Sequence, residues 1–357
     1  MAEQLAPVKI NAAFIVKDEW PLLALSVSHA LFHYAEKVII IDTGSHDGTF
    51  QGIKILQSIW GDRIELYRCN QEIYDQTPLT NLLLELSKNS QCEWTMVLDA
   101  DEFFIHDNYV DFLSKLSQTE ENWLAYAIDV INFIVNEGHN ELELKAYGEI
   151  SYRVVGQSKV TCTDTEYIEK VLSGVYPLQL RITPQKILAR NSNHIFLSQG
   201  NHQVVFGDGV WWEKFDSKVA SAANLGGKIY HLPYTSERRI RNRKERSFFD
   251  QQKTTARLNW PELQKQSTSD LLLKAVVGDQ NRDEWLESNL IIEDDSFNRA
   301  LRPVIEKIRE IWPDLIDAVY STSTQETFPD ALDLRIVSKL IRKYHDRAEK
   351  LWPGISL

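Results

Sequence analysis

Several features that define common protein classes are missing from this sequence. Its three cysteines, Cys69, Cys92 and Cys162, form neither a CxxC pair nor a Cys/His zinc pattern, so a reducing compartment is expected and a disulfide framework is not. No apolar run reaches the length of about 18 residues that a membrane span needs. The amino terminus also lacks the basic start and apolar core of a signal peptide. These absences predict a soluble, cytoplasmic protein.

Basic residues are in the minority, with 39 lysines and arginines against 51 acidic residues and a net charge of −12. This balance argues against nucleic acid as a partner but permits an acidic site that recruits a divalent cation. Neither GxGxxG nor GxxxxGK[ST] occurs, which disfavours dinucleotide-linked oxidoreductases and P-loop enzymes. The remaining composition is that of an ordinary globular protein, with 43% hydrophobic and 25% charged residues.

What is present is an alternation of strand and helix patterns over the first hundred residues. The run "KVIIID" is a nearly continuous β-branched stretch, typical of a strand covered on both faces. Strands are expected at residues 9–17, 37–42, 63–69 and 93–98, and helices at 18–35, 48–60 and 77–90, with Thr77 as the cap of the last. This alternation predicts an α/β fold with a mostly parallel, Rossmann-like sheet and helices on both faces.

The rest of the chain follows a different pattern. One strand is expected over residues 123–135, followed by short, turn-broken segments, and from residue 236 onward the pattern is helical. Phe297, Leu301, Val304, Ile308 and Ile311 fall on one helical face. We therefore expect residues 1–125 and 126–235 to be two halves of one catalytic domain, and residues 236–357 to be a helical extension.

Two acidic segments follow predicted core strands. In "WTMVLDADEFF" the carboxylates of Asp99 and Asp101 are two residues apart, a spacing that in a strand places side chains on one face. Such a pair suits Mg²⁺ or Mn²⁺, which also takes phosphate oxygens of a substrate as ligands. The alternative is a turn whose acids face solvent. Because ligands bind beyond the carboxyl ends of parallel strands, the position favours a site.

The second acidic segment, "VIIIDTGSHDGTF", ends a strand in Asp42 and continues through a loop with Gly44 and Gly48. Glycine permits tight turns close to a ligand. The structural interpretation is that Asp47 caps the following helix and Asp42 only ends a strand. Capping by Asp47 does not exclude a ligand role for Asp42.

Together the two segments resemble the amino-terminal half of family 2 glycosyltransferases with the glycosyltransferase A fold. The closest likeness is to a single-domain soluble branch whose motifs run near VDSGSTDGT and LDADE. The start "AAFIVKDEW" and the later segments "PQKILAR", "GNHQVVF" and "IYHLPYTSERRIRNRK" also resemble that branch. The resemblance covers roughly residues 9–246 and does not extend to the remaining carboxyl-terminal part.

The resemblance implies a role for particular residues. Asp42 and the end of the first strand would hold the nucleotide base and ribose, and Asp99 and Asp101 would hold the metal and the donor diphosphate. His231 would complete the metal site. The positions implied to contact the donor are Phe14, Val16, Lys17, Glu19, Asp42, Gly44, Ser45, Asn81, Asp99, Ala100, Asp101, Lys186 and Arg238.

The general base stays open at this point. In the resembling proteins an acid often follows the histidine of the Gly-x-His turn, whereas Gln203 follows His202 here. An inverting transfer needs a group that accepts the proton of the acceptor hydroxyl. His202, Asp208 and Glu213 are the candidates.

The resemblance, together with the acid pair, thus implies a metal-dependent glycosyltransferase of the hexosyltransferase type that inverts the anomeric configuration. It would use Mn²⁺ or Mg²⁺ and a nucleotide-sugar donor, in particular a UDP-sugar, with a saccharide or other hydroxyl acceptor. A nucleotidyltransferase and an inactive nucleotide- or sugar-binding module are the alternatives. Basic side chains in the last predicted helix, at residues 332–352, are compatible with a solvated face or with peripheral contact with an anionic membrane.

Overall fold

The computed structural model describes residues 8–69, 76–120, 123–136, 139–155, 164–180, 183–192, 195–197, 199–202, 204–206, 219–233, 235–236, 239 and 281–320. The chain divides into two compact units. Unit 1 combines Met1–Asp129, Pro184–Ile229 and Asp314–Leu357, and unit 2 combines Val130–Thr183 and Tyr230–Pro313. Each unit is described by itself.

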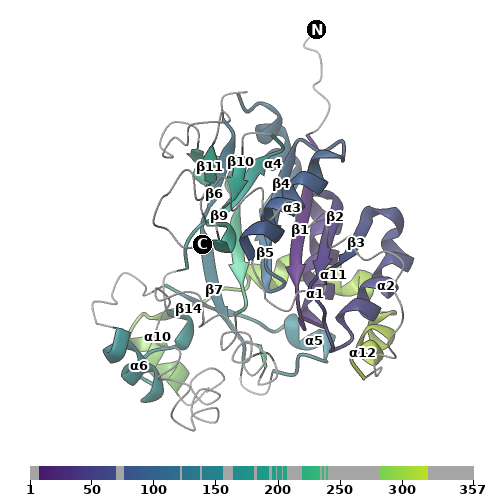
Figure 1. The fold of residues 1–357 in the computed structure, drawn as a ribbon. Helices are drawn as coiled ribbons and strands as arrows, with labels where there is room; N and C mark the ends of the chain where they lie inside the picture. Colours follow the sequence, from purple (N-terminus) through teal and green to yellow (C-terminus); the bar gives the residue numbers. More distant parts are fainter. Residues whose placement is uncertain are drawn as a thin grey trace. The chain divides into compact units, whose positions relative to one another are not determined.

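Unit 1 is built on a seven-stranded sheet in the order β12-β6-β9-β4-β1-β2-β3. The neighbours in β4-β1-β2-β3 run parallel, and β9 is antiparallel to both β4 and β6. The strands are β1 (Ile10–Val16), β2 (Ala35–Asp42), β3 (Ile64–Arg68), β4 (Trp94–Leu98), β6 (Ala125–Ile128), β9 (Lys186–Arg190) and β12 (Val219–Ser221). Figure 1 shows β1, β2 and β3 side by side, as the order requires.

The other elements of unit 1 surround this sheet. Its helices are α1 (Leu22–His33), α2 (Thr49–Trp60), α3 (Gln76–Lys88) and α4 (Tyr109–Ser117). Its short 3-10 helices are η1 (Gly61–Arg63), η4 (Gln199–Asn201) and η5 (Ala222–Asn224). Its further strands are β5 (Glu102–Ile105) and the antiparallel hairpin of β10 (Ile195–Leu197) and β11 (Val204–Phe206).

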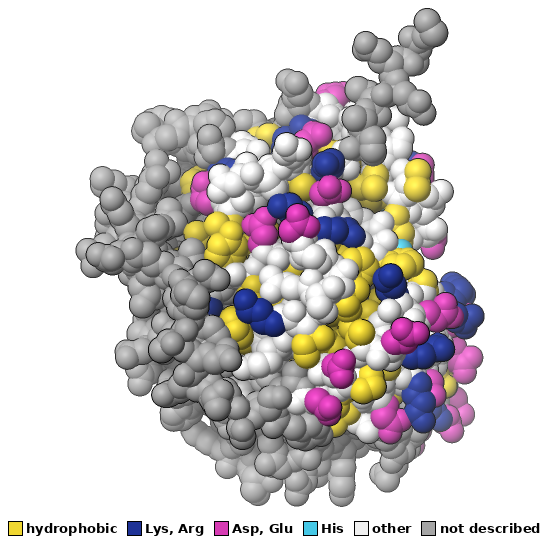
Figure 2. Space-filling view, turned by 90° about the vertical axis from the view of Figure 1, so that its right-hand side faces the viewer, with side chains coloured by type: hydrophobic (Ala, Val, Ile, Leu, Met, Phe, Trp, Pro, Cys, Tyr) yellow, Lys and Arg dark blue, Asp and Glu magenta, His cyan; other side chains and the backbone are white. Residues whose placement is uncertain are grey.

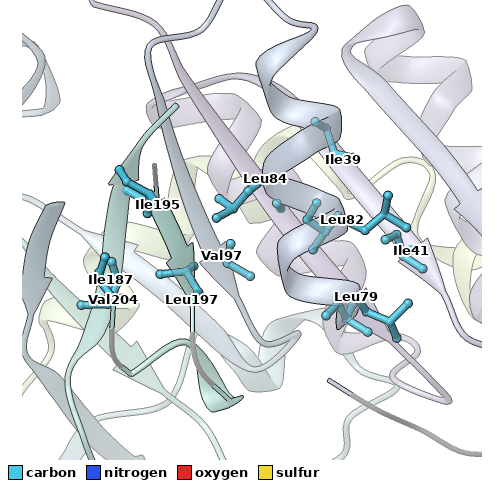
Figure 3. Packing of buried hydrophobic residues seen from close by; sticks show 14 of the residues in the cluster. Ile39, Ile41, Leu79, Leu82, Leu84, Val97, Ile187, Ile195, Leu197 and Val204 are labelled. Carbon is cyan, nitrogen blue, oxygen red and sulfur yellow. The ribbon is translucent and has the colours of Figure 1, made fainter. Parts of the chain in front are cut away.

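The core of unit 1 lies between α3 and one face of the sheet. Figure 3 shows leucines of α3 beside strand residues of the sheet, namely Leu79, Leu82, Leu84, Ile39, Ile41 and Val97. Because strand side chains alternate between faces, the intervening Phe14 and Ile40 point to the opposite face, and both are fully buried there. The helix α1 packs against β2 without joining the α3 cluster. Helices therefore cover both faces, and the predicted α/β fold class is confirmed.

Unit 2 contains an antiparallel arrangement in which β8 pairs with both β7 and β14. Its strands are β7 (Val130–Ile134), β8 (Tyr152–Val154) and β14 (Ile291–Glu293). Its helices are α5 (Leu144–Tyr147), α6 (Asp164–Leu172), η3 (Leu178–Leu180), α10 (Arg282–Glu287) and α11 (Ser296–Ile308). β13 (Lys228–His231) and α12 (Trp312–Tyr320) cross the unit boundaries.

Several predicted elements differ in detail. The helix expected from residue 18 begins at Leu22, because Asp18 has a left-handed backbone with φ 54 and the following residues form a turn. Thr77 lies inside α3 and is not its cap. The strand expected over residues 123–135 is two strands, β6 and β7, interrupted at Asp129.

In α11 the predicted face is present, since Phe297, Leu301, Val304 and Ile308 are buried, whereas Ile311 lies beyond the helix. Among the described residues, no helix combines the length and apolarity needed to cross a bilayer. Figure 2 shows acidic and basic side chains interspersed over the face in view, as on an ordinary solvated surface.

Candidate functional site

The parallel strands of unit 1 bring polar strand ends to one edge of the sheet. Val16 of β1 is in register with Asp42 of β2, and Asp42 is in register with Arg68 of β3. Phe14 of β1 is in register with Leu98, the last residue of β4. Asp42 and the Asp99 segment therefore end strands on either side of β1. With the usual strand spacing, the two strand ends are roughly 10 Å apart.

Asp42 is completely buried at this edge. Its Oδ1 accepts hydrogen bonds from the backbone N–H of Ser45, at 3.0 Å, and from the Ser45 hydroxyl. Its Oδ2 lies 3.3 Å from Nε of Arg68, an ion-pair contact that lacks hydrogen-bond geometry. Burial raises the pKa of Asp42, and the Ser45 hydrogen bonds and the Arg68 charge offset this effect only in part.

Arg68 is a site residue that the sequence analysis missed. Its guanidinium lies over the ring of Phe50, 4.9 Å from the centroid, besides pairing with Asp42. Phe50 belongs to the first turn of α2. A basic residue that ends the strand next to an acid-terminated strand was the available signal. Register places Arg68 beside Asp42 once the strands are known to be parallel neighbours.

The loop after β2 is locked to the loop after β1. Ser45 Oγ accepts the backbone N–H of Asp18 at 2.9 Å, and Asp18 Oδ1 accepts the backbone N–H of His46 at 2.6 Å. Asp47 Oδ2 accepts the backbone N–H of Trp20 at 3.1 Å. Because each loop supplies both donors and acceptors, the two are held as one polar rim above β1 and β2.

The N-cap of α2 is Gly48, one residue later than the predicted cap Asp47, but Asp47 still contacts the start of the helix. Its Oδ1 accepts the backbone N–H of Thr49, the first residue of the helix, at 3.1 Å. Gly44 has φ 92, a left-handed conformation that suits glycine in this loop.

The other residues predicted to contact the donor near the end of β1 differ in exposure. Phe14, Val16 and Glu19 are buried. Lys17 is half-buried. The carbonyl of Val16 accepts both the N–H and the hydroxyl of Thr43. Their donor contacts stay predictions.

Asp99, Ala100 and Asp101 lie in a turn between β4 and β5, because β4 ends at Leu98. The expectation that strand spacing gives both acids one face is therefore wrong. The Asp99 side chain is 44% exposed, whereas Asp101 as a residue is only 1% exposed. Asp99 is thus the accessible carboxylate of the pair. Ala100 between them is buried.

Lys186 and Glu102 both contact Asp99. Lys186 Nζ lies 2.9 Å from Asp99 Oδ2 and 3.1 Å from Glu102 Oε1. The other oxygen of Glu102 accepts the backbone N–H of Asp99 at 2.9 Å. Lys186 is only 1% exposed and lies on β9, an inner strand of the sheet between β6 and β4. Burial opposes its charged form, but the two carboxylates outweigh burial and raise the pKa of Lys186 above its ordinary value.

Asn81 joins α3 to the hairpin of β10 and β11. Its Nδ2 donates to the carbonyl of Leu197 at 3.0 Å, and its Oδ1 accepts the backbone N–H of Leu197 at 2.9 Å. Its carboxamide thus binds the protein's own backbone, and its predicted donor contact stays a prediction.

His202 follows the turn at Gly200, which has φ 75. A Cβ at Gly200 would lie 2.6 Å from the His202 ring, so glycine is needed for this close approach. His202 Nδ1 is 2.9 Å from the carbonyl oxygen of Gln185. Since a carbonyl only accepts, Nδ1 carries the proton and Nε2 is the basic nitrogen.

His231 belongs to unit 2 and has a similar arrangement. Its Nδ1 is 2.8 Å from Oδ1 of Asn132. Asn132 Nδ2 donates to the carbonyl of Gln179, which fixes the orientation of the amide and makes Oδ1 the acceptor. Nε2 of His231 is therefore the lone-pair nitrogen, the form that a metal ligand or a base requires.

No group of three or more His, Cys, Asp and Glu side chains is placed to hold a metal within the part of the chain that the structure describes. A divalent cation that binds with a nucleotide does not need such a group, because one or two carboxylates, waters and substrate phosphates complete its shell. Asp99 supplies an accessible carboxylate of the hard-oxygen type that Mg²⁺ and Mn²⁺ prefer. The residues present at Asp99 therefore fit such a cation. Asp208, Glu213 and Arg238 lie outside the described residues.

Comparison with known proteins gives distant similarities. No protein-family model matches the chain. A TPR repeat-containing protein from Synechococcus elongatus is 30% identical over 128 residues, 34% of this chain and 27% of that protein. The chain thus matches about a quarter of the length of this curated relative.

Among solved structures, Staphylococcus aureus TarS 1–349 in complex with UDP is 10% identical, with a TM-score of 0.33 and coverage of 94% of this chain and 92% of that one. The mannosyltransferase PcManGT from Pyrobaculum calidifontis, in complex with GDP-Man and Mn²⁺, is 11% identical, with a TM-score of 0.35 and coverage of 99% and 91%. GalNAc-T7 with UDP, GalNAc and Mn²⁺ is 10% identical, with a TM-score of 0.37 and coverage of 80% and 59%. A proposal for function therefore has to rest on the residues of this chain.

Proposed function

We propose that the protein is a metal-dependent glycosyltransferase that moves a sugar from a UDP-sugar to an acceptor hydroxyl with inversion at the anomeric carbon. The observation that carries the proposal is a pair of acids at one edge of a parallel sheet: Asp42, which ends β2, and Asp99, which begins the turn after β4. One acid, Asp42, is buried beside an arginine, and the other, Asp99, is accessible beside a buried lysine. The motif resemblance of both segments supports the same assignment.

Asp42 suits the nucleoside end of such a donor. A carboxylate removed from water is a strong acceptor for N–H and O–H groups of a base or ribose. Ser45 and Arg68 hold the Asp42 carboxyl in place before any ligand arrives. The loops around Asp18 and Asp47 would enclose this end, because they are already tied to each other. Asp42 is 0% exposed, so a ligand would reach its carboxylate only after a local movement of these loops.

Asp99 suits the diphosphate end. A divalent metal bound there would neutralise the charge that develops on the leaving diphosphate. Asp99 would provide its oxygen ligand, and Glu102 and Lys186 would keep that carboxylate in a fixed orientation. Asp101 would contribute from its buried position only after a small local movement, since it is 1% exposed. The ligand role that the motif resemblance implies for His231, a residue of unit 2, stays a prediction.

The acceptor side requires a base for the attacking hydroxyl. His202 has the tautomer that this role needs, with Nδ1 fixed by Gln185 and Nε2 basic. Asp208 and Glu213 remain the other candidates. We assign the role to His202 as a hypothesis. A general base is inactive once protonated, so a pH–rate profile of His202→Gln that kept the wild-type acidic limb would exclude it.

The proposal is tested with a panel of UDP-sugars and Mn²⁺, by measuring UDP release from wild type and from Asp99→Asn. The variant is expected to lose about 10²-fold or more in turnover, the usual effect of removing a group that stabilises a leaving charge. Asp62→Asn is the matched control, because Asp62 is exposed at the opposite end of β3. Both variants are checked for folding by circular dichroism.

Three outcomes separate the proposal from its alternatives. Turnover in wild type that falls in Asp99→Asn but not in Asp62→Asn supports transfer. Metal-dependent UDP binding without turnover of any donor indicates a binding module. Release of pyrophosphate from a nucleoside triphosphate and a sugar phosphate indicates a nucleotidyltransferase. Either of the last two contradicts the proposal.

A further inference from the structure

The turn after β4 already has a positive charge beside it that belongs to the protein itself, the ammonium group of Lys186. Lys186 Nζ lies 2.9 Å from Asp99 Oδ2 and 3.1 Å from Glu102 Oε1. Lys186 is the first residue of β9, the antiparallel neighbour of β4, and its ammonium group therefore reaches the acids from the adjacent strand. It is 1% exposed. This contact is part of the folded sheet and does not depend on a ligand.

Glu102 differs from Asp99 in how its oxygens are used. One oxygen contacts Lys186 and the other accepts the backbone N–H of Asp99. Glu102 is 1% exposed, whereas the Asp99 side chain is 44% exposed. Glu102 is therefore the fixed structural partner of the ammonium, and Asp99 is the carboxylate that faces incoming ligands.

A metal on Asp99 would lie close to this ammonium. Given the Lys186–Asp99 contact and a metal–oxygen distance of about 2.1 Å, the metal and Nζ would be roughly 4–7 Å apart. Two cations at that separation repel one another, and a half-buried position screens them incompletely. A diphosphate removes the conflict, because its negative oxygens contact the metal and compensate both positive charges.

We propose that Lys186 keeps free divalent metal out of the Asp99 site, so that the metal enters together with the nucleotide diphosphate. The inference rests on the proposed function and adds an order of binding to it. In this account Lys186 acts through its charge on Asp99 and is a positioning residue. A purely structural lysine would leave the affinity for free metal unchanged.

The test measures Mn²⁺ binding without nucleotide by electron paramagnetic resonance of the free ion. Lys186→Met removes the charge while keeping the length of the side chain, and it is expected to bind Mn²⁺ at least about tenfold more tightly than wild type. Lys186→Gln is a second neutral variant whose amide still donates to the two carboxylates, in case the methionine variant does not fold. Lys186→Arg keeps the charge and is expected to stay within about threefold of wild type.

Lys37→Met is the matched control, because Lys37 pairs with Glu65 on the same sheet and its loss changes the net charge equally. It is expected to bind Mn²⁺ as wild type does. A folded neutral variant of Lys186 with wild-type or weaker Mn²⁺ affinity overturns the inference. Wild type that binds Mn²⁺ equally well with and without UDP overturns it too. Failure of the proposed function is distinct, since wild type would then not bind UDP even with Mn²⁺ present.

Discussion

Replacing Gly52 by alanine tests how the loops of the site are supported. Gly52 lies in α2, and a Cβ built on it would be 2.1 Å from Cζ2 of Trp20 and 2.3 Å from Cε2. Trp20 is fully buried. Its indole N–H donates to the carbonyl of Leu315, and its backbone N–H donates to Asp47. The ring is therefore held at both ends and has little freedom to move.

The sign of the effect follows from two opposing terms. Alanine is favoured over glycine inside a helix by about 1 kcal/mol. Forcing a methyl group into a packed core costs about 1–3 kcal/mol, and more where the neighbour is rigid. Because the overlap with Trp20 is far inside van der Waals contact, the steric term wins. With the steric cost near the upper end of that range and the helix term subtracted, we expect Gly52→Ala to lower the free energy of unfolding by about 1–2 kcal/mol.

Urea denaturation measures this effect. Ser58→Ala is the control, since Ser58 is exposed on α2 and its hydroxyl donates only within the helix, to the carbonyl of Ile55. Trp20→Phe combined with Gly52→Ala completes a double-mutant cycle, and the smaller ring is expected to recover part of the loss. Gly52→Ala that is as stable as wild type, or more stable, would refute the reasoning.

Two further predictions concern charge. Lys186→Met leaves the buried carboxylate of Glu102 without its ion pair, so a loss of about 3–5 kcal/mol in unfolding free energy is expected; a urea midpoint equal to that of wild type would contradict this. In unit 2, burial lowers the pKa of His139 from 6.5 to about 4. The folded state therefore holds fewer protons than the unfolded state between those values, and stability falls as pH drops from about 6.5 to about 4, by about 3 kcal/mol in total. His139→Gln should flatten this part of a stability–pH curve. An unchanged slope would contradict the lowered pKa of His139 as the cause.

The sequence determines the first half of unit 1 well. Segments such as "KVIIID" combine β-branched composition with turn residues directly after them, so local pattern and burial agree. The start of α1 was less predictable. Asp18 and Glu19 look like helix-start residues, but tertiary hydrogen bonds draw Asp18 into contact with Ser45 and His46 instead. Such contacts depend on a partner loop distant in sequence, which local propensity does not contain.

The site was predicted unevenly for a related reason. Asp42 and Asp99 could be placed because strand ends of a parallel sheet share an edge. The turn that separates the exposure of Asp99 from that of Asp101 depends on Glu102 folding back onto Asp99. The burial of Lys186 depends on β9 being inserted antiparallel between β4 and β6. Arg68 became visible only through strand register. These features of the site depend on pairing between segments distant in sequence, which the local sequence pattern does not contain.

The most direct measurement of the central claim is a crystal structure of the protein with UDP and Mn²⁺, with anomalous data collected for manganese. The account predicts an anomalous peak within bonding distance of an Asp99 oxygen, bridged to the diphosphate, and the nucleoside against Asp42. Density for UDP elsewhere, with Asp99 contacting only water and Lys186, would contradict it.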